Sequence, residues 1–170
     1  MEDISPKFQW NPYDAAVSKK LIDLEETPEA IKLFSQVCDK LTDYGYWYLL
    51  STLWVSYTGF SDIELWKKLF SSKRRFRVDC IMKPSEFQEY NKLPNNIKVY
   101  RVHRPNETDW IAYTLNFNVA KRFASERDVN VITEYTVRRK DITALFLRRS
   151  EFEIIMLNKN KAKFVQEHLI

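Results

Sequence analysis

The chain has 170 residues, of which 45% are hydrophobic and 29% charged, and its formal net charge at pH 7 is +4. A chain of this length can build one hydrophobic core but not two full domains, so we expect a single domain over residues 1–170. Its only two glycines are Gly45 and Gly59, which excludes the glycine-rich phosphate loops of Walker and dinucleotide-fold proteins. Any nucleotide must therefore be held by side chains and ordinary backbone.

Cysteine usage and hydropathy favour a soluble, cytoplasmic protein. Cys38 and Cys80 are the only cysteines, and no apolar run follows a basic start, so neither a disulfide framework nor secretion is indicated. No apolar stretch approaches the roughly 20 residues that cross a bilayer, and we expect a monomer without membrane association. The small positive charge suits an anionic ligand or partner, but it falls short of a dedicated nucleic-acid face, so nucleic acid is the less favoured partner.

The first part of the chain, residues 1–95, has mainly helical patterns. A first helix is predicted to begin after the cap Thr27, with Pro28 at its first position, and to end at Gly45. A second carries an apolar stripe from Trp47 and stops near Gly59. Tryptophans at helical spacing, at positions 47, 54 and 66, are expected in the core.

Two further helices complete this part. Ser61 and Glu64 form a capping-box pair that opens a third helix, and a fourth is predicted over about 84–91. The basic run Lys73–Arg77 comes after the third helix. We interpret it as a solvated loop between helix and strand rather than as a docking or phosphate-binding patch.

From Asn96 onward the apolar period changes from helical spacing to two, which indicates strands. Strands are predicted at 97–103, 110–114, 130–138, 142–147, 152–157 and 162–167, with one helix at 117–125. Helices first and then mainly strands predict an α+β fold, in which residues 96–170 form the β part.

Three of these strands carry polar side chains among apolar neighbours. Arg101 ends the first run, Thr114 ends Ala112-Tyr113-Thr114, and Glu153 follows Arg149-Ser150-Glu151-Phe152 and precedes Ile154-Ile155-Met156. An arginine fork can grip phosphate or ribose oxygens. A carboxylate beside an apolar run is costly unless it faces a pocket or partner, so these groups are candidates for a site on a rigid scaffold.

The order of arginine, hydroxyl and Glu-x-Glu resembles the mono-ADP-ribosyltransferases of the arginine-serine-glutamate class, especially their phage and bacterial members. The resemblance covers roughly residues 44–157 and includes "LPNNIKVYR", "AYTLNFNVAKRFA" and "RRSEFEIIM". It implies a split antiparallel or mixed β-sandwich with a helical amino-terminal half. It also implies an enzyme that transfers ADP-ribose from NAD, its co-substrate, to a macromolecular acceptor and releases nicotinamide. A phage-encoded protein would act in the host cytoplasm on a host protein.

The resemblance assigns catalytic roles to three residues. Glu153 would hold the nicotinamide-ribose 2′-hydroxyl and stabilise the ribosyl cation, which is similar to the oxocarbenium species of glycoside cleavage. Glu151, two residues earlier, would orient or deprotonate the acceptor. Arg101 would fix NAD in the cleft.

The other cofactor-binding residues follow from the same resemblance. Thr114 would supply a hydroxyl to the catalytic glutamate or the ribose, and Tyr113 would stack on the nicotinamide. Phe123, in the helix that follows, would either wall the pocket or belong to the core. Val102 stands where the family has a glycine that approaches the nicotinamide amide, and Ala112 stands where the family has a serine.

These two departures keep other functions open. One is NAD glycohydrolysis, in which water replaces the acceptor, and another is a catalytically silent binder or inhibitor. No metal site is predicted, because His103 and His168 have no second ligand at useful spacing and are expected to be solvated.

Overall fold

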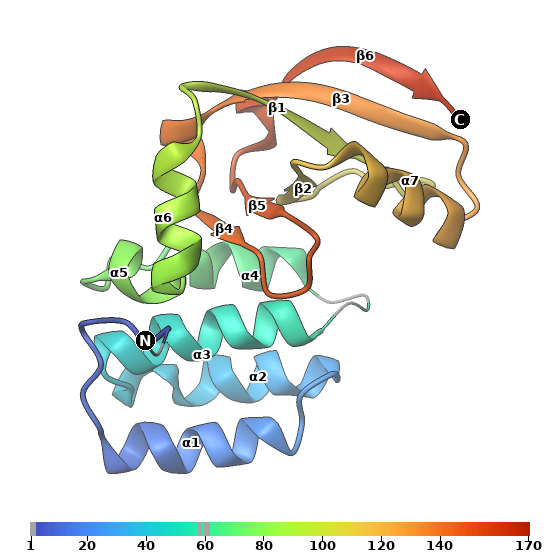
Figure 1. Cartoon of the computed structure of the whole chain (residues 1–170). Helices are drawn as coiled ribbons and strands as arrows, with labels where there is room; N and C mark the ends of the chain where they lie inside the picture. Colours follow the sequence, from blue (N-terminus) through green and yellow to red (C-terminus); the bar gives the residue numbers. More distant parts are fainter. Residues whose placement is uncertain (1–2, 58, 60–61) are drawn as a thin grey trace. The chain divides into compact units, whose positions relative to one another are not determined.

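The computed structural model describes residues 3–57, 59 and 62–170. The chain divides into two compact units, Met1–Gln88 and Glu89–Ile170 (Figure 1). The boundary falls within helix α6 (Pro84–Lys92), shortly before the division that the sequence predicts between its helical and β parts. In the part of the chain described, no helix is both long and apolar enough to span a membrane.

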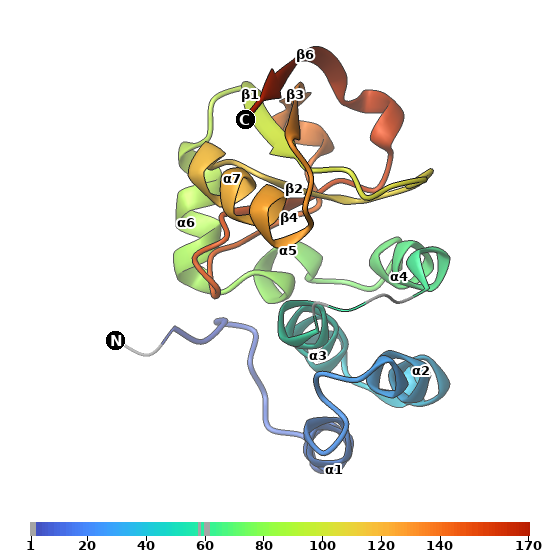
Figure 2. The same ribbon diagram turned by 90° about the vertical axis from the view of Figure 1, so that its right-hand side faces the viewer.

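The first unit is built from helices. They are α1 (Pro12–Ile22), α2 (Pro28–Val37), the short 3-10 helix η1 (Cys38–Lys40), α3 (Asp43–Ser56), α4 (Ile63–Phe70) and α5 (Arg77–Ile81). Figure 2 shows α1, α2 and α3 end-on and side by side. The largest fully buried side chains here are Trp47, Trp66, Phe34 and Phe70, so the core positions predicted for two of the tryptophans are confirmed. Trp54 is half-buried, with its ring edge-on to Trp66.

Gly45 does not end a helix, contrary to our prediction, but lies inside α3. A Cβ at this position would lie 2.1 Å from Oδ2 of Asp14, a side chain of α1. The same carboxylate accepts a hydrogen bond from the backbone N–H of Thr42 at 3.0 Å. Thr42 in turn caps α3 by accepting a bond from the Gly45 N–H at 2.9 Å. The glycine is therefore needed for close approach of Asp14 and not for a turn.

Helix starts follow the sequence signals in most places. Thr27 precedes Pro28 at the start of α2 as predicted, but its hydroxyl donates to the Leu24 carbonyl at 2.6 Å instead of capping the helix. The predicted cap Ser61 lies outside the described residues. In the structure Asp62 is the cap of α4, and its side chain accepts a bond from the Leu65 N–H.

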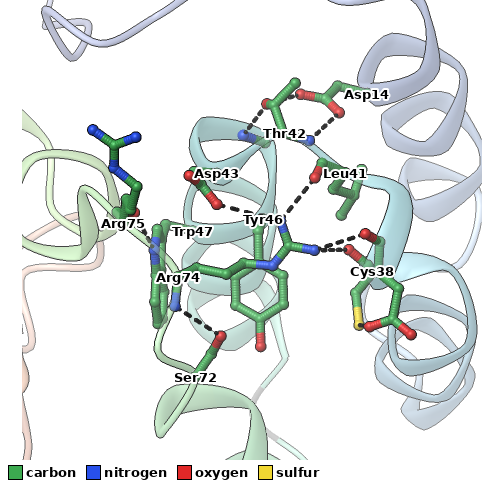
Figure 3. Close-up of polar contacts among 12 residues, drawn as sticks. Asp14, Cys38, Leu41, Thr42, Asp43, Tyr46, Trp47, Ser72, Arg74 and Arg75 are labelled. Atoms are coloured by element: carbon green, nitrogen blue, oxygen red, sulfur yellow. Dashed lines mark hydrogen bonds and ion pairs between the residues drawn. The ribbon is translucent and has the colours of Figure 1, made fainter.

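The basic run Lys73–Arg77 joins two helices, α4 and α5, rather than a helix and a strand. It is also more than a solvated loop, because of the contacts of Arg74. Its guanidinium donates to the carbonyls of Cys38, Asp39 and Leu41 at 2.8–2.9 Å, where α2 and η1 end (Figure 3). The same group lies 4.7 Å from the centre of the Tyr46 ring. A cation at the carbonyls of a helix end is stabilising, so Arg74 is a structural residue.

We expect Arg74→Met to lower the free energy of unfolding by about 2–3 kcal/mol, because several carbonyls lose a charged donor at once. Urea unfolding followed by circular dichroism measures this change. Arg75→Met is the matched control: Arg75 is exposed, and its variant should lie within about 0.5 kcal/mol of the wild type. If Arg74→Met lowers the free energy of unfolding as little as Arg75→Met does, water replaces the Arg74 guanidinium without penalty.

The second unit contains a six-stranded antiparallel sheet and one long helix. The strands are β1 (Asn96–Arg101), β2 (Ala112–Thr114), β3 (Val131–Arg138), β4 (Ala144–Phe146), β5 (Glu153–Ile155) and β6 (Lys163–Leu169), and the helix is α7 (Phe117–Glu126). All six predicted strands and the predicted helix are present. The strand order is β4-β5-β2-β1-β3-β6, and the chain has the predicted α+β class.

Helix α7 covers one face of this sheet. Ala120 and Ala124 of α7 form a buried cluster with Val102 and Ile132, and Phe123 packs against it. The two alanines bring the helix close to the sheet. Asn116 caps α7 by accepting bonds from the Asn118 and Val119 N–H groups.

The sheet is nearly divided between β1 and β2. These strands share one register pair, Tyr100 with Thr114, whereas β1 and β3 share six pairs from Asn96 to Arg101. The carboxyl end of β1 and the start of β2 therefore part directly after Tyr100. Arg101, the next residue along the chain, lies at this division.

Candidate functional site

Glu153 and Thr114 face each other across two strands. They are register partners of β5 and β2. The Leu115 N–H donates to the Phe152 carbonyl, and the Met156 N–H donates to the Ile111 carbonyl. Along an antiparallel pair of strands, such hydrogen-bonded residue pairs alternate with pairs that are not hydrogen-bonded. Glu153 and Thr114 are thus a non-hydrogen-bonded pair, whose Cα atoms lie about 4.5 Å apart with side chains on one face. This places Thr114 beside the carboxylate-bearing Glu153 that the sequence singled out.

Thr114 organises the segment before Glu153. Its hydroxyl donates to the carbonyl of Glu151 at 2.7 Å and accepts from the N–H of Asn116 at 3.1 Å. The hydroxyl is therefore bonded to the backbone of the Glu-x-Glu segment. It fixes where β5 begins.

The backbone on both sides of Glu151 is strained. Ser150 and Phe152 have φ angles of 54° and 49°, in the left-handed region that residues with a side chain rarely adopt. Each such residue costs on the order of 1–3 kcal/mol, and strain of this kind clusters at functional sites. Phe152 is also 39% exposed. The turn presents Glu151 and Glu153 in a conformation that ordinary loop sequences would avoid.

Glu151 is paired with two arginines. Its Oε1 lies 3.4 Å from Arg149 and 3.7 Å from Arg122 of α7, and its side chain is 17% exposed. A partly buried carboxylate between two guanidiniums is held in place and can orient a donor or accept its proton. Glu153 is half-buried.

Arg101 lies in a hydrogen-bonded network that the sequence did not reveal. Its Nε and one terminal nitrogen both donate to the carboxylate of Glu107, and its other terminal nitrogen donates to the Ala112 carbonyl at 2.7 Å. The two side chains are only 12% and 10% exposed. The guanidinium thus connects the end of β1 to the first residue of β2.

The network continues from Glu107 through His103. Nδ1 of His103 lies 2.9 Å from Glu107, and its Nε2 lies 2.8 Å from the hydroxyl of Tyr135 on β3. Trp110 packs edge-on against the His103 ring, with centroids 4.3 Å apart. Burial alone would raise the pKa of Glu107, but hydrogen bonds from His103 and Arg101, together with their charges, lower it to about 2.

Two typical free energies, when compared, show whether a ligand can displace Glu107 from Arg101. Leaving one member of a buried ion pair unpaired costs about 3–5 kcal/mol. A new hydrogen bond to a charged group returns about 1.5–3 kcal/mol. Glu107 therefore stays on Arg101 when a ligand binds, and only the remaining N–H groups of Arg101 are open to it.

Of the three apolar or aromatic candidates, Val102 and Tyr113 are buried and Phe123 is partly buried. The Val102 side chain is 2% exposed and faces α7, which leaves its backbone at the division of the sheet; its carbonyl accepts a bond from Arg127 at 2.6 Å. Tyr113 is 3% exposed and its hydroxyl accepts from the Trp110 indole at 2.9 Å. Phe123 packs against the α7 cluster, beneath the guanidiniums of Arg122 and Arg127.

Arg101 and Glu153 are not brought onto the same face of the sheet. Tyr100 is the register partner of Thr114, which faces Glu153, and side chains alternate along a strand, so Arg101 points to the opposite face. Both residues nevertheless adjoin β2. Arg101 bonds its first residue and Glu153 pairs with its last, about 7 Å further along the strand.

Positive charge gathers at the carboxyl end of β1. Burial and the charges of Arg104 and Arg101 lower the pKa of Arg127 to about 10, so Arg127 stays charged at neutral pH. Glu107 neutralises one of these three guanidiniums. The surplus suits an anionic ligand near the Arg101 end of the division.

The histidines are only partly exposed and each contacts a glutamate, contrary to our prediction that they are solvated. His103 takes part in the Glu107 network, and Nε2 of His168 on β6 lies 2.7 Å from the buried Glu134 of β3. Lys98 completes this second group with its Nζ 3.0 Å from Glu134. Periodicity could not show that Glu134 would meet Lys98 and His168, because each of these pairs joins residues far apart in the sequence.

The candidate residues lie around β2 on the two faces of the sheet. One face carries the fixed guanidinium of Arg101, and the other carries the Glu153 carboxylate next to Thr114. The chain matches no protein-family model, no curated protein and no solved structure. Its function is therefore inferred from its own residues. Among the described residues, no cluster of three or more His, Cys, Asp or Glu side chains has the arrangement of a metal site.

Proposed function

We propose that this protein is an NAD-dependent mono-ADP-ribosyltransferase that transfers ADP-ribose to a macromolecular acceptor, in the first place a protein, and releases nicotinamide. The observation that carries the proposal is the pairing of Glu153 with Thr114, directly after a turn in which Ser150 and Phe152 have positive φ. A carboxylate held in this way can stabilise the positive charge that develops on the ribose.

Of the fold that the resemblance implies, a split β-sandwich with a helical amino-terminal half, the structure has the α+β class, with its six strands in one antiparallel sheet. A single register pair joins β1 to β2, and the residues of all three motifs lie around it. A dinucleotide has separate phosphate and nicotinamide-ribose groups, so Arg101 and Glu153 can contact different parts of one ligand. The proposal requires NAD to reach both faces of the sheet at the carboxyl end of β1, where β1 and β2 part.

Glu151 is the candidate that directs the acceptor. Arg149 and Arg122 hold its carboxylate within 3.7 Å, two residues from Glu153 on the same strained segment. In this position it can bind a guanidinium or accept a proton from the nucleophile. By the same resemblance, arginine is the proposed acceptor side chain.

Labelled NAD and a cell lysate provide the test. We expect the wild-type protein to release nicotinamide and to transfer label to a macromolecule of discrete size. Protease treatment of the product separates a protein acceptor from a nucleic acid. Nicotinamide release without labelled macromolecules would instead show NAD glycohydrolysis, and the absence of both products would contradict both enzymatic functions.

One observation favours a second candidate, a catalytically silent binder. Glu107 and the Ala112 carbonyl already occupy much of the Arg101 guanidinium. If that occupation prevents NAD from binding, the protein retains the fold without turnover. A calorimetric titration with NAD, combined with an assay of nicotinamide release, distinguishes the two, because the transferase must bind NAD and the silent protein must show no turnover.

A further inference from the structure

Arg101 is held from two sides before any ligand arrives. A guanidinium has five N–H donors. Three of these are used in the bonds that Arg101 makes to Glu107 and to the Ala112 carbonyl. Glu107 takes the side formed by Nε and one terminal nitrogen, so one N–H remains on each terminal nitrogen. The group can therefore still offer donors to an anion, but only in a fixed orientation.

Glu107 is itself fixed by the fold. It belongs to the segment between β1 and β2, where the preceding residue Asn106 has a φ of 60°. Its Oε2 accepts from Nε of Arg101 at 3.0 Å and lies 2.9 Å from Nδ1 of His103. His103 is anchored in turn by Tyr135 on β3. A chain of hydrogen bonds thus runs from the centre of the sheet to the guanidinium.

We propose that Glu107 is a positioning residue for dinucleotide binding, which holds Arg101 so that its remaining N–H groups meet the phosphate oxygens of NAD. This inference rests on the proposed function. An arginine that is already ordered loses little conformational freedom when the ligand binds, so its contribution to affinity is larger than that of a mobile side chain.

The opposite role for Glu107 is that of an internal competitor, which occupies Arg101 in place of phosphate. The burial of both side chains argues against this role, because a displaced Glu107 would remain in a poorly solvated position. The two roles predict opposite changes in affinity. Positioning predicts weaker NAD binding when Glu107 is removed, and competition predicts tighter binding.

A double-mutant cycle tests the proposal. The dissociation constant for NAD is measured by calorimetry for the wild type, Glu107→Gln, Arg101→Lys and the double variant, and kcat is measured by nicotinamide release. We expect Glu107→Gln to raise Kd for NAD about tenfold with kcat changed less than about threefold. In the Arg101→Lys background the same substitution should change Kd by less than about twofold, because Glu107 acts through Arg101.

Two further variants make the result decisive. Asp109→Asn is the control, since Asp109 lies in the same segment but pairs with Lys159 at 3.8 Å, and its Kd should equal that of the wild type. Glu107→Asp keeps the charge but shortens the side chain, and it should give a smaller rise in Kd than Glu107→Gln does. Circular dichroism confirms that each variant is folded, and if the glutamine variant does not fold, the aspartate variant carries the test.

Each outcome separates this inference from the proposed function. If the wild type binds NAD and both Glu107 variants have an unchanged or lower Kd, the positioning role is wrong. The proposed function then stays intact. Equal effects of Glu107→Gln in both backgrounds overturn it as well. If the wild type binds no NAD, the proposed function fails, and the inference fails with it.

Discussion

Replacing Glu153 with glutamine is expected to lower the rate of ADP-ribose transfer by about 10²–10³-fold, the usual loss when a preorganised electrostatic group is removed. Glutamine has nearly the same shape and can still hydrogen-bond a hydroxyl, so NAD binding should change less than about tenfold. The charge matters most in the transition state, where the ribose becomes positive while nicotinamide leaves. Release of nicotinamide from labelled NAD measures the rate, and calorimetry measures the binding.

Glu89→Gln is the matched control for this change. Glu89 lies on α6, is exposed, and forms an ion pair with Lys92 at the helix surface. Its variant should retain the full rate. Unaltered transfer by the Glu153 variant would show that another carboxylate stabilises the ribosyl cation. Glu151 would be the next candidate, because it lies on the same strained segment.

The strands were predictable because short runs either alternate polar and apolar side chains, as β1 does, or are apolar throughout, as β4 is. In β1, for example, Ile97 and Val99 are buried while Asn96 and Lys98 are exposed. Such alternation depends only on local sequence and on one buried face. For the same reason, the three motif strands could be recognised before their neighbours in the sheet were known.

The helical errors have a different cause. Helix α1 is absent from our prediction although Asn11, whose side chain accepts from the Tyr13 and Asp14 N–H groups, precedes Pro12, a start signal that is present in the sequence. Helix α5 has only five residues and follows Phe76 in a left-handed conformation, so no local pattern indicates it. Gly45 suggests a stop because glycine often ends helices. Only the position of Asp14 explains why this glycine lies within one.

The site shows the same limit of local patterns. Glu153 and Thr114 could be singled out because polar groups interrupt apolar strands. Glu107 could not, because it lies among polar residues in "RPNETDW", where a carboxylate is expected to be solvated. Its importance comes from Arg101 and His103, which meet it only after β1 ends and the chain turns back.

Acid should reveal how much the Arg101–Glu107 pair stabilises the fold. The folded state lowers the pKa of Glu107 from 4.5 to about 2. A carboxyl with a depressed pKa contributes stability that is fully present above the unfolded value and is lost as the pH falls through the folded value. A difference of this size corresponds to about 3 kcal/mol, which should disappear between about pH 5 and pH 2.

The free energy of unfolding, measured in urea at each pH for the wild type and Glu107→Gln, tests this expectation. At pH 6 the wild type should be more stable by about 3 kcal/mol, and the two curves should converge toward pH 2, where the protonated glutamate resembles glutamine. Glu134 and Asp141 also have lowered pKa values, but they are present in both proteins, so the difference between the curves isolates Glu107. Parallel curves would mean that the pair adds no pH-dependent stability. In that case the network would hold Arg101 without stabilising the fold, because the cost of burying both charges would cancel their attraction.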